Sequence, residues 1–356
     1  MNKVLMVENA CRDLLQCGIF DARKKSVNFI KKNFFHRTVA KEDLIFWPSG
    51  LLAAGLWSSR EELLEDGPEV RGIERTLTAY YERWMKKGTP IAVIDDLLAG
   101  ETLLAIDREI RKGSRCFEGS LTGQQTEAAV HRLAAYAQEH PKDEAGSFFY
   151  RPAGGEPYIF VDGIGLACPF LYQYGEEFDR QEYRELALRQ IVNFLSYGMD
   201  GVTGLPYHGY DTTDGCKYGV IGWGRAVGWL LRGMMGCMIS DYGKERLSAS
   251  CVSLMDVVLT YQRQDGYFSW QMQALDGPAD TSATGMICAA LKKGLKLEIL
   301  CGGGYERALS AGCRALEGSV RDGRVFQCSG ECEGFARYPQ NYSAYPWSTG
   351  PALEVL

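Results

Sequence analysis

The stretch YIFVDGIGLACPFL, residues 158–171, is an apolar run that contains a single acidic residue, Asp162. Burying a carboxylate is costly unless it is paired or hydrogen-bonded, so this placement needs a reason. One explanation is structural, because an Asp just ahead of an apolar helix is a good N-cap. The other is chemical, because a buried carboxylic acid can act as a general acid.

A second group of chemically capable side chains lies in one loop and the helix start that follows it. The group contains His208, Tyr210, Trp223, Arg225 and Trp229. Two indoles beside a guanidinium suit an acidic sugar, because aromatic faces stack on the ring and Arg forks onto a carboxylate. Buried core tryptophans, an ordinary Arg–acid pair and a structural His are the alternative explanation.

Asp95 and Asp96 form a third group, in the segment VIDDLLAGETLL. One of them is expected to cap the helix that should begin here. The other is then available for a site, and the pattern leaves open which of the two it is. Cys328 and Cys332 in CSGEC lack a second pair at zinc-finger spacing and nearby histidines, so we expect no metal.

The composition of the whole chain excludes several classes of function. The 356 residues carry a net charge of −6, which argues against nucleic-acid binding. No apolar stretch approaches the roughly 20 residues needed to span a membrane, and the first residues lack a signal-peptide pattern. The twelve cysteines are scattered, so we expect reduced thiols and a cytoplasmic protein. No nucleotide-binding or serine-hydrolase motif is present.

Six apolar segments rich in small residues recur along the chain. Anchored on their glycines, they are separated by 50, 63, 61, 61 and 65 residues. Several have Ser, Thr or Asp just ahead of the apolar part, as a helix start would. The anchors are Gly50, Gly100, Gly163, Gly224, Gly285 and Gly350.

Amphipathic segments lie between the apolar ones. In one of them Tyr183, Leu186 and Ile191 are among the apolar residues at helical spacing. Six buried helices surrounded by six half-exposed ones predict an all-α (α/α)6 barrel of six helical hairpins, as a single domain over residues 1–356, with an open superhelix as the alternative. No segment predicts a strand. In a barrel the inner helices all begin at one mouth, where we expect any site. The amphipathic segments are 72–87, 125–140, 179–197 and 244–264, with 9–34 and 305–317 weaker.

The order VDG…CPFLYQYG, H-x-Y-D, WGRAVGW, Y-x-x-Q-D-G-Y-F and D-T-S-A-T-G-M resembles the unsaturated glucuronyl and rhamnogalacturonyl hydrolases. These are glycoside hydrolase families 88 and 105, and the second is closer. The resemblance extends from about residue 40 to 350, and WGRAVGW and the VDG helix are its most specific parts. Phe160 and Tyr150 stand where family members often have Trp and His.

This resemblance implies a hydrolase that releases a 4,5-unsaturated uronic acid from the non-reducing end of lyase-generated oligosaccharides, with an unsaturated rhamnogalacturonan disaccharide as the expected substrate. A carboxylic acid protonates C4 of the enol ether, water adds at C5, and the hemiketal collapses. Asp162 matches the acid/base and Asp95 the second aspartate. Lys217 is a candidate to help Arg225 bind the carboxylate. The expected substrate-binding residues are His208, Trp223, Arg225, Trp229, Trp47, Tyr150 and Tyr210.

Two other classes of function fit the same pattern of segments. A sugar epimerase or an inverting glycosidase could occupy the same barrel, although an epimerase typically needs paired histidines and the chain has four in all. A non-catalytic helical scaffold would leave the aromatic and arginine residues at the mouth unexplained. We expect no cofactor, no nucleic-acid or membrane partner, and a monomer or homodimer.

Overall fold

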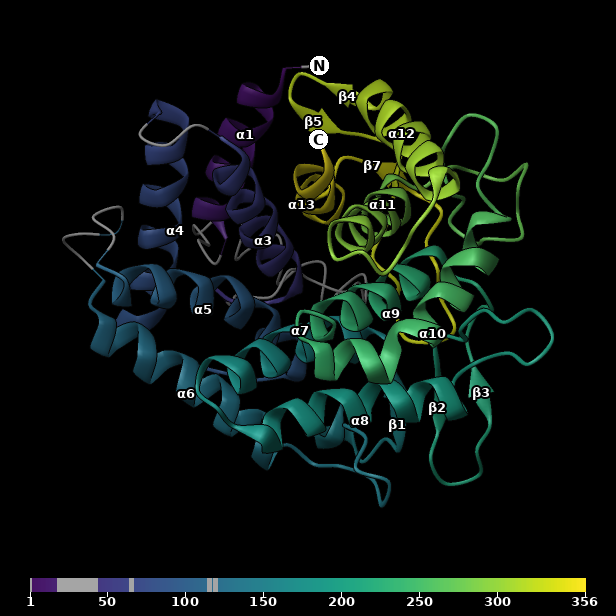
Figure 1. Ribbon diagram of the computed structural model, residues 1–356, viewed down its shortest axis with the longest axis horizontal. Helices are drawn as coiled ribbons and strands as arrows, with labels where there is room; N and C mark the ends of the chain where they lie inside the picture. The colour runs from purple at the N-terminus through teal and green to yellow at the C-terminus, as the bar shows by residue number, and fades with distance from the viewer. Residues whose placement is uncertain (1, 18–43, 64–66, 114–116, 118–120) are drawn as a thin grey trace, which may run out of the picture.

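The computed structural model describes residues 2–17, 44–63, 67–113, 117 and 121–356, and these residues form twelve α-helices arranged as a ring (Figure 1). Short 3-10 turns, η1 (Ile94–Leu97) and η3 (Pro152–Gly154), lie in the loops. The helices are α1 (Lys3–Gln16), α3 (Trp47–Glu62), α4 (Pro68–Lys86), α5 (Leu98–Arg111), α6 (Gly123–Glu139), α7 (Asp162–Glu177), α8 (Gln181–Tyr197), α9 (Gly224–Cys237), α10 (Asp241–Leu259), α11 (Thr281–Lys296), α12 (Gly303–Gly318) and α13 (Pro346–Val355).

The odd-numbered helices from α3 to α13 form a closed inner ring. Each packs against the next one, and α13 packs against α3. The other helices, from α1 to α12, lie outside them. Burial separates the two layers: α7 has 13 of its 16 residues buried, whereas α8 has six of its 17. The predicted (α/α)6 barrel is therefore confirmed, and the open superhelix is not what the chain forms.

The ring closes where two glycines bring α3 and α13 together. A Cβ on Gly350 would lie 2.4 Å from the carbonyl oxygen of Leu51, and a Cβ on Gly55 would lie 2.3 Å from that of Gly350. These distances are far below van der Waals contact, so only glycine permits this approach. In Figure 1 both chain ends lie on this side of the ring, where α1 packs against α13.

Within the described ranges, seven strands of two or three residues lie in the loops that enter the inner helices. Strand β2 pairs antiparallel with β1 and with β3, and β4 pairs with β5 and β6 with β7. The sequence predicted no strands, because runs this short cannot display the alternation that identifies a half-buried strand. The strands are β1 (Tyr158–Phe160), β2 (Gly209–Asp211), β3 (Lys217–Tyr218), β4 (Val320–Arg321), β5 (Arg324–Val325), β6 (Cys328–Ser329) and β7 (Tyr342–Ser343).

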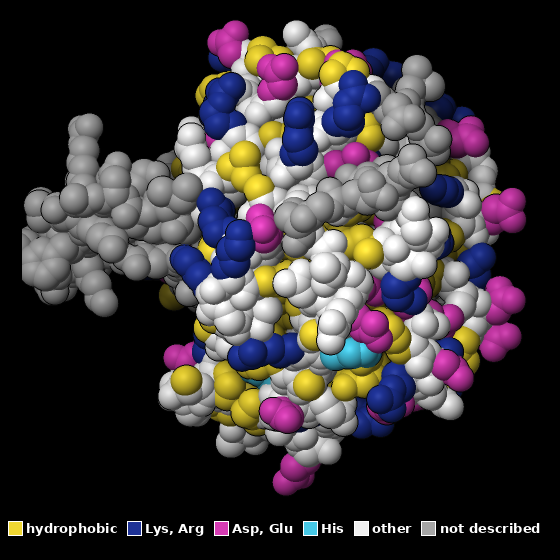
Figure 2. Space-filling model, turned by 90° about the vertical axis from the view of Figure 1, so that its left-hand side faces the viewer, with side chains coloured by type: hydrophobic (Ala, Val, Ile, Leu, Met, Phe, Trp, Pro, Cys, Tyr) yellow, Lys and Arg dark blue, Asp and Glu magenta, His cyan; other side chains and the backbone are white. Residues whose placement is uncertain are grey.

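The described residues also test the sequence for membrane helices, metal sites and disulfides. Among the described residues, no helix is long and apolar enough to cross a membrane, and no group of three or more His, Cys, Asp and Glu side chains could hold a metal ion. The eleven cysteines in the described ranges are free thiols. On the face in Figure 2, acidic and basic side chains are intermixed. The part of the predicted amphipathic segment 9–34 beyond residue 17 lies outside the described residues.

Candidate active site

A cavity of about 580 Å³ opens at the N-terminal ends of the inner helices. The starts of α3, α7, α9 and α13 contribute to it, together with η1 ahead of α5 and the loop at 331–334. Most of the predicted site residues meet here. Those that line the cavity are Asp162, Asp95, His208, Trp223, Arg225, Trp229, Trp47 and Tyr150.

Asp162 is the first residue of α7, yet its side chain does not cap the helix. Its Oδ2 instead lies 2.9 Å from Nε2 of His208, and the side chain pair is buried. The local sheet creates this pair, because Phe160 of β1 pairs with Gly209 of β2 and the Val161 N–H donates to the His208 carbonyl. The Asp162 carboxylate therefore points toward His208 and not toward the backbone N–H groups at the start of α7.

The neighbouring aspartates Asp95 and Asp96 have separate roles. Asp96 accepts hydrogen bonds from the backbone N–H groups of Ala92 and Val93, at 2.7 and 3.2 Å, and so caps η1. Asp95 lines the cavity and receives both terminal nitrogens of Arg151, at 3.2 and 2.9 Å. Of the two acids that the sequence could not separate, Asp95 is the one that faces the site.

Arg151 and Tyr150 complete this carboxylate's surroundings. The Arg151 guanidinium lies 4.0 Å from the centre of the Tyr150 ring. Burial alone would lower the pKa of Arg151, but the charge and hydrogen bonds of Asp95 raise it above its usual range, so the cation persists. Burial raises the pKa of Tyr150 well above its usual value, and the charge of Asp95 adds to this effect. Tyr150 is therefore a neutral hydroxyl at any ordinary pH.

Arg225 is buried and mainly supports a loop. Nη1 donates to the Oγ and the carbonyl of Ser329, at 2.6 and 3.1 Å, and Nη2 donates to the Gly330 carbonyl at 2.6 Å. The Asp280 carboxylate lies 3.8 Å from Nη1, and the Trp223 ring is 4.8 Å away. Both terminal nitrogens of Arg225 already have protein partners. The structure therefore does not hold Arg225 in position for the predicted bidentate hydrogen bond to a substrate carboxylate.

Two aromatic walls enclose the cavity. In the first, the ring of Trp47 lies 4.8 Å from Trp347 and 6.2 Å from Trp229. In the second, Tyr150 stacks on Phe160 at 4.5 Å. Gly165 makes room for the first wall, because a Cβ there would lie 2.5 Å from the Trp229 ring. Aromatic side chains with a few polar groups among them are the lining that small-molecule sites commonly have.

Tyr210 and Lys217 lie elsewhere, contrary to the prediction. Tyr210 is buried outside the cavity and donates to Oγ of Ser147, at 3.4 Å. It packs on Phe194 and Tyr197 of α8, because alternate residues of β2 face opposite sides. Lys217 bonds to the Met199 carbonyl and does not line the cavity.

Comparison with known proteins places the chain in a family. The family model described as Glycosyl Hydrolase Family 88 matches residues 47–355. The chain belongs to glycoside hydrolase family 88. The resemblance drawn from the sequence is thereby confirmed, and this family 88 protein is a glycoside hydrolase.

Three relatives of this family 88 chain illustrate its similarities. Protein Atu3128 of Agrobacterium fabrum is 32% identical over 167 residues, covering 42% of this chain and 70% of the relative. The unsaturated rhamnogalacturonyl hydrolase YesR of Bacillus subtilis is 23% identical over 352 residues and 95% of each chain. A crystal structure from Klebsiella pneumoniae, described as a possible member of the GH105 family, has a TM-score of 0.80 at 15% identity, covering 98% of this chain and 90% of that one.

Several residues of the family 88 cavity were missed from the sequence. Arg151 and Trp347 line the cavity and contact Asp95 and Trp47, and Tyr338, which is not a lining residue, contacts His208; each is far along the chain from that partner. No local spacing connects them to their partners. Cys332 was weighed as a metal ligand, and it instead lines the cavity.

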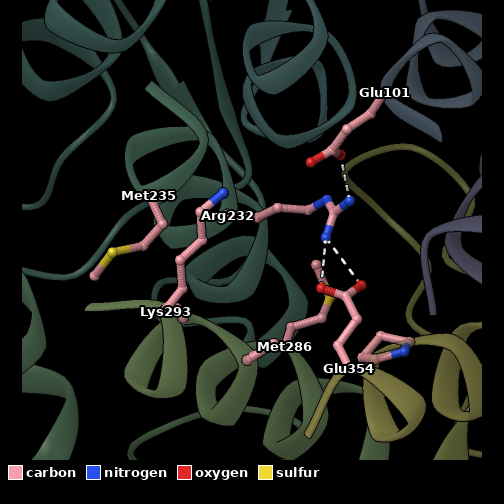
Figure 3. A pocket seen from close by; sticks show the side chains of 9 residues that line it. Glu101, Arg232, Met235, Met286, Lys293 and Glu354 are labelled. Carbon is pink, nitrogen blue, oxygen red and sulfur yellow. Dashed lines mark hydrogen bonds and ion pairs between the residues drawn. The ribbon is translucent and has the colours of Figure 1, made fainter. Parts of the chain in front are cut away.

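A second cavity of about 50 Å³ lies inside the family 88 barrel, lined by residues further along the inner helices. Figure 3 shows Arg232 of α9 between Glu101 of α5 and Glu354 of α13, with Lys293 alongside. Arg232 donates to Glu101 at 2.6 Å and to Glu354 at 3.0 and 3.2 Å. This ionic cluster ties three inner helices together across the barrel.

Proposed function

We propose that this family 88 chain hydrolyses the 4,5-unsaturated uronic acid from the non-reducing end of lyase-generated oligosaccharides, and that its substrate is an unsaturated rhamnogalacturonan disaccharide. The observation that carries this proposal is the buried Asp162–His208 pair at a cavity with a second carboxylate and two aromatic walls. Such a cavity can hold a sugar ring between its walls, with an acid beside it.

The proposed chemistry is hydration of the enol-ether double bond. Protonated Asp162 gives its proton to C4, which leaves positive charge shared between C5 and the ring oxygen. Water adds at C5, and the Asp162 carboxylate takes a proton from it. The hemiketal so formed opens to a ketone and releases the second sugar. Asp95, held by Arg151, is the charge that stabilises the cation as it forms.

The charges at the cavity favour an uncharged second sugar. Glu156 and Glu331 lie exposed on the lining. Arg151 and Arg225, the two arginines that line the cavity in the described part of the chain, already have protein partners. A sulfate on the second sugar would meet these two carboxylates, and the arginines of the described lining are already engaged, whereas rhamnose carries no charge. The name of the Bacillus subtilis relative, an unsaturated rhamnogalacturonyl hydrolase, supports the same choice.

A panel of disaccharides tests this function. The purified protein is given unsaturated disaccharides from pectin and from sulfated glycosaminoglycans, with saturated disaccharides as a control, and the loss of enol-ether ultraviolet absorbance is followed. We expect turnover of unsaturated substrates alone, with kcat/KM about tenfold or more higher for the uncharged second sugar. Cleavage of saturated substrates would indicate an inverting glycosidase. An unchanged yield of reducing sugar would indicate an epimerase, and binding without turnover would indicate a non-catalytic scaffold.

Variants separate the choice of second sugar from the chemistry. In Glu156→Gln combined with Glu331→Gln, kcat/KM for a sulfated substrate should rise toward that for the uncharged one. Glu245→Gln, on the outer helix α10 and exposed, is the matched control and should leave the ratio unchanged. An unchanged ratio in the double variant would refute this part of the proposal. A cytoplasmic location, a single domain, and a monomer or homodimer stay predictions from the sequence.

A further inference from the structure

His208 is the middle of a chain of hydrogen bonds that ends at the acid. Its Nε2 lies 2.9 Å from Oδ2 of Asp162, and its Nδ1 lies 2.9 Å from the hydroxyl of Tyr338. The Tyr338 oxygen in turn lies 3.2 Å from the backbone N–H of Val220. Tyr338 comes from the loop between β6 and β7, and it was not among the residues predicted from the sequence.

The direction of each bond in this chain follows from the donors available. The Val220 N–H can only donate, so the Tyr338 oxygen accepts there. Among the described residues, Nδ1 of His208 is the sole acceptor for the Tyr338 hydroxyl. The hydroxyl therefore donates to Nδ1. A neutral His208 must then carry its proton on Nε2, from which it donates to Oδ2 of Asp162.

This tautomer decides where the acid keeps its proton. When Nε2–H donates to Oδ2, a protonated Asp162 carries its proton on the other oxygen, Oδ1, and that oxygen does not bond to His208. In the opposite tautomer, bare Nε2 would accept the proton of Oδ2, and the acid would donate to the imidazole instead of to substrate. The two tautomers thus correspond to a competent and a blocked acid.

We propose that Tyr338 is a positioning residue which, by donating to Nδ1, holds His208 in the Nε2–H tautomer and so keeps the proton of Asp162 available for the substrate. This inference rests on the proposed function, in which Asp162 is the acid. Tyr338 itself touches neither the reacting carbon nor the carboxylate; it acts through His208.

The surroundings of Tyr338 make it a dependable donor. Its ring packs against His208 and Trp223, with centroids 5.7 and 5.5 Å apart, and against Trp270 at 6.1 Å. Burial raises the pKa of Tyr338 above its usual value, and the charge of Asp162 adds to the effect. The hydroxyl therefore retains its proton wherever the enzyme could work.

The direct test is the tautomer of His208, measured by long-range ¹H–¹⁵N NMR on the full chain labelled with ¹⁵N-histidine. His208→Asn identifies the signal. In the wild type at neutral pH we expect a protonated Nε2 and an unprotonated Nδ1. Tyr338→Phe removes the donor, so the signal should move toward the Nδ1–H form. A wild-type His208 protonated on Nδ1 would overturn the inference, and so would a Tyr338→Phe signal identical to that of the wild type.

Kinetics on an unsaturated disaccharide provide the second readout. Tyr338→Phe should lower kcat about tenfold and leave KM within about twofold, because binding contacts are kept while the competent acid is depleted. Tyr342→Phe is the matched control, since its hydroxyl bonds to Gln340 and not to His208. A tautomer change without a fall in kcat would overturn the positioning role. Absence of wild-type turnover would refute the proposed function instead, while the NMR result would still decide the tautomer.

Discussion

At the scale of single residues, each of the three aspartates at or next to the cavity is fixed by its own partner. Asp162 is held by His208, Asp95 by Arg151, and Asp96 by two backbone N–H groups. Three carboxylates with similar local sequence therefore have three different environments. Two of them face the cavity, and the third stabilises the turn that presents its neighbour.

Substituting the two adjacent aspartates one at a time should show that one is needed for activity and the other for stability. Asp95→Asn should lower kcat at least about 100-fold, with the free energy of unfolding changed by less than about 1 kcal/mol, because the half-exposed Arg151 can be solvated. Asp96→Ala should instead cost about 2 kcal/mol, because two backbone donors lose a charged acceptor. Denaturant unfolding and kinetics on one unsaturated disaccharide measure both effects. A stable, inactive Asp96→Ala variant would contradict the assignment.

A site residue could be predicted from the sequence when the signal for it was local, and not when it depended on a partner far along the chain. Asp162 and Trp223 could be placed at the cavity because each lies at the start of a recognisable apolar helix, and Trp229 follows within the second turn of α9. The pairing of Asp162 with His208 was not foreseen, since it depends on the register of β1 and β2. Tyr210 was placed in the site wrongly for the same reason: a strand of three residues gives no sign of which side chain points inward.

At the scale of helices, small residues set how closely the inner helices approach. Five of the six glycine anchors that revealed the repeat in the sequence are close packing points in the barrel, as at Gly350 against Leu51, whereas a Cβ on Gly163 would meet only Tyr150 at 3.9 Å. The sequence could therefore predict where the inner helices begin. It could not predict the charged cluster around Arg232, whose three helices are far apart in the chain.

Alanine at two helical glycines should have opposite effects on stability. Gly350→Ala puts a Cβ against the Leu51 carbonyl and should cost about 1–3 kcal/mol of unfolding free energy. Gly72→Ala, in α4 with no atom within 4 Å of a new Cβ, should add about 0.5–1 kcal/mol. Denaturant unfolding of both variants compares them. Equal effects at the two positions would refute the close approach of α3 and α13.

Removing Arg232, the cation between Glu101 and Glu354, should make the free energy of unfolding depend strongly on pH. Burial alone would raise the pKa of Glu101, but Arg232 and Lys293 lower it below its usual value; burial raises the pKa of Glu354. Without Arg232 the folded-state pKa of both acids would lie above the unfolded value. Arg232→Met should therefore cost about 3 kcal/mol at neutral pH, and this cost should shrink as pH falls toward about 4.5.

Unfolding measured at both pH values tests this expectation. Lys86→Met is the control, because that side chain is 71% exposed and its one ion pair with a described residue is with Glu82 on its own helix. Its effect should be below about 0.5 kcal/mol at either pH. A cost of Arg232→Met that grew on acidification would contradict the proposed role of the cluster.

At the scale of the whole molecule, the closed ring makes the inner helices mutually dependent. Each inner helix is covered by two neighbours, and α13 closes the ring between α11 and α3. The six-fold repeat and its two helix types sufficed to predict this architecture from sequence. The loops could not be predicted in the same way, because their shape comes from pairings between segments that are distant in the chain, such as β6 with β7.

Removal of the last inner helix should unfold the entire barrel. A chain ending at residue 345 lacks α13 and exposes the buried faces of α3 and α11. In an open array of repeats, loss of a terminal unit lowers stability by a limited increment. In a closed ring we expect no cooperative thermal transition in the shortened chain, followed by circular dichroism. A cooperative transition only slightly below that of the full chain would contradict closure.

The central claim is that Asp162 is the acid that protonates the enol ether, and one rate measurement tests it most directly. The ultraviolet absorbance of an unsaturated disaccharide is followed with the wild type, with Asp162→Asn, and with Asp179→Asn, whose side chain is 97% exposed. The wild type and Asp179→Asn should remove the absorbance at the same rate, whereas Asp162→Asn should be about 10²–10⁴-fold slower. If Asp162→Asn removes it as fast as the wild type, Asp162 is not the acid.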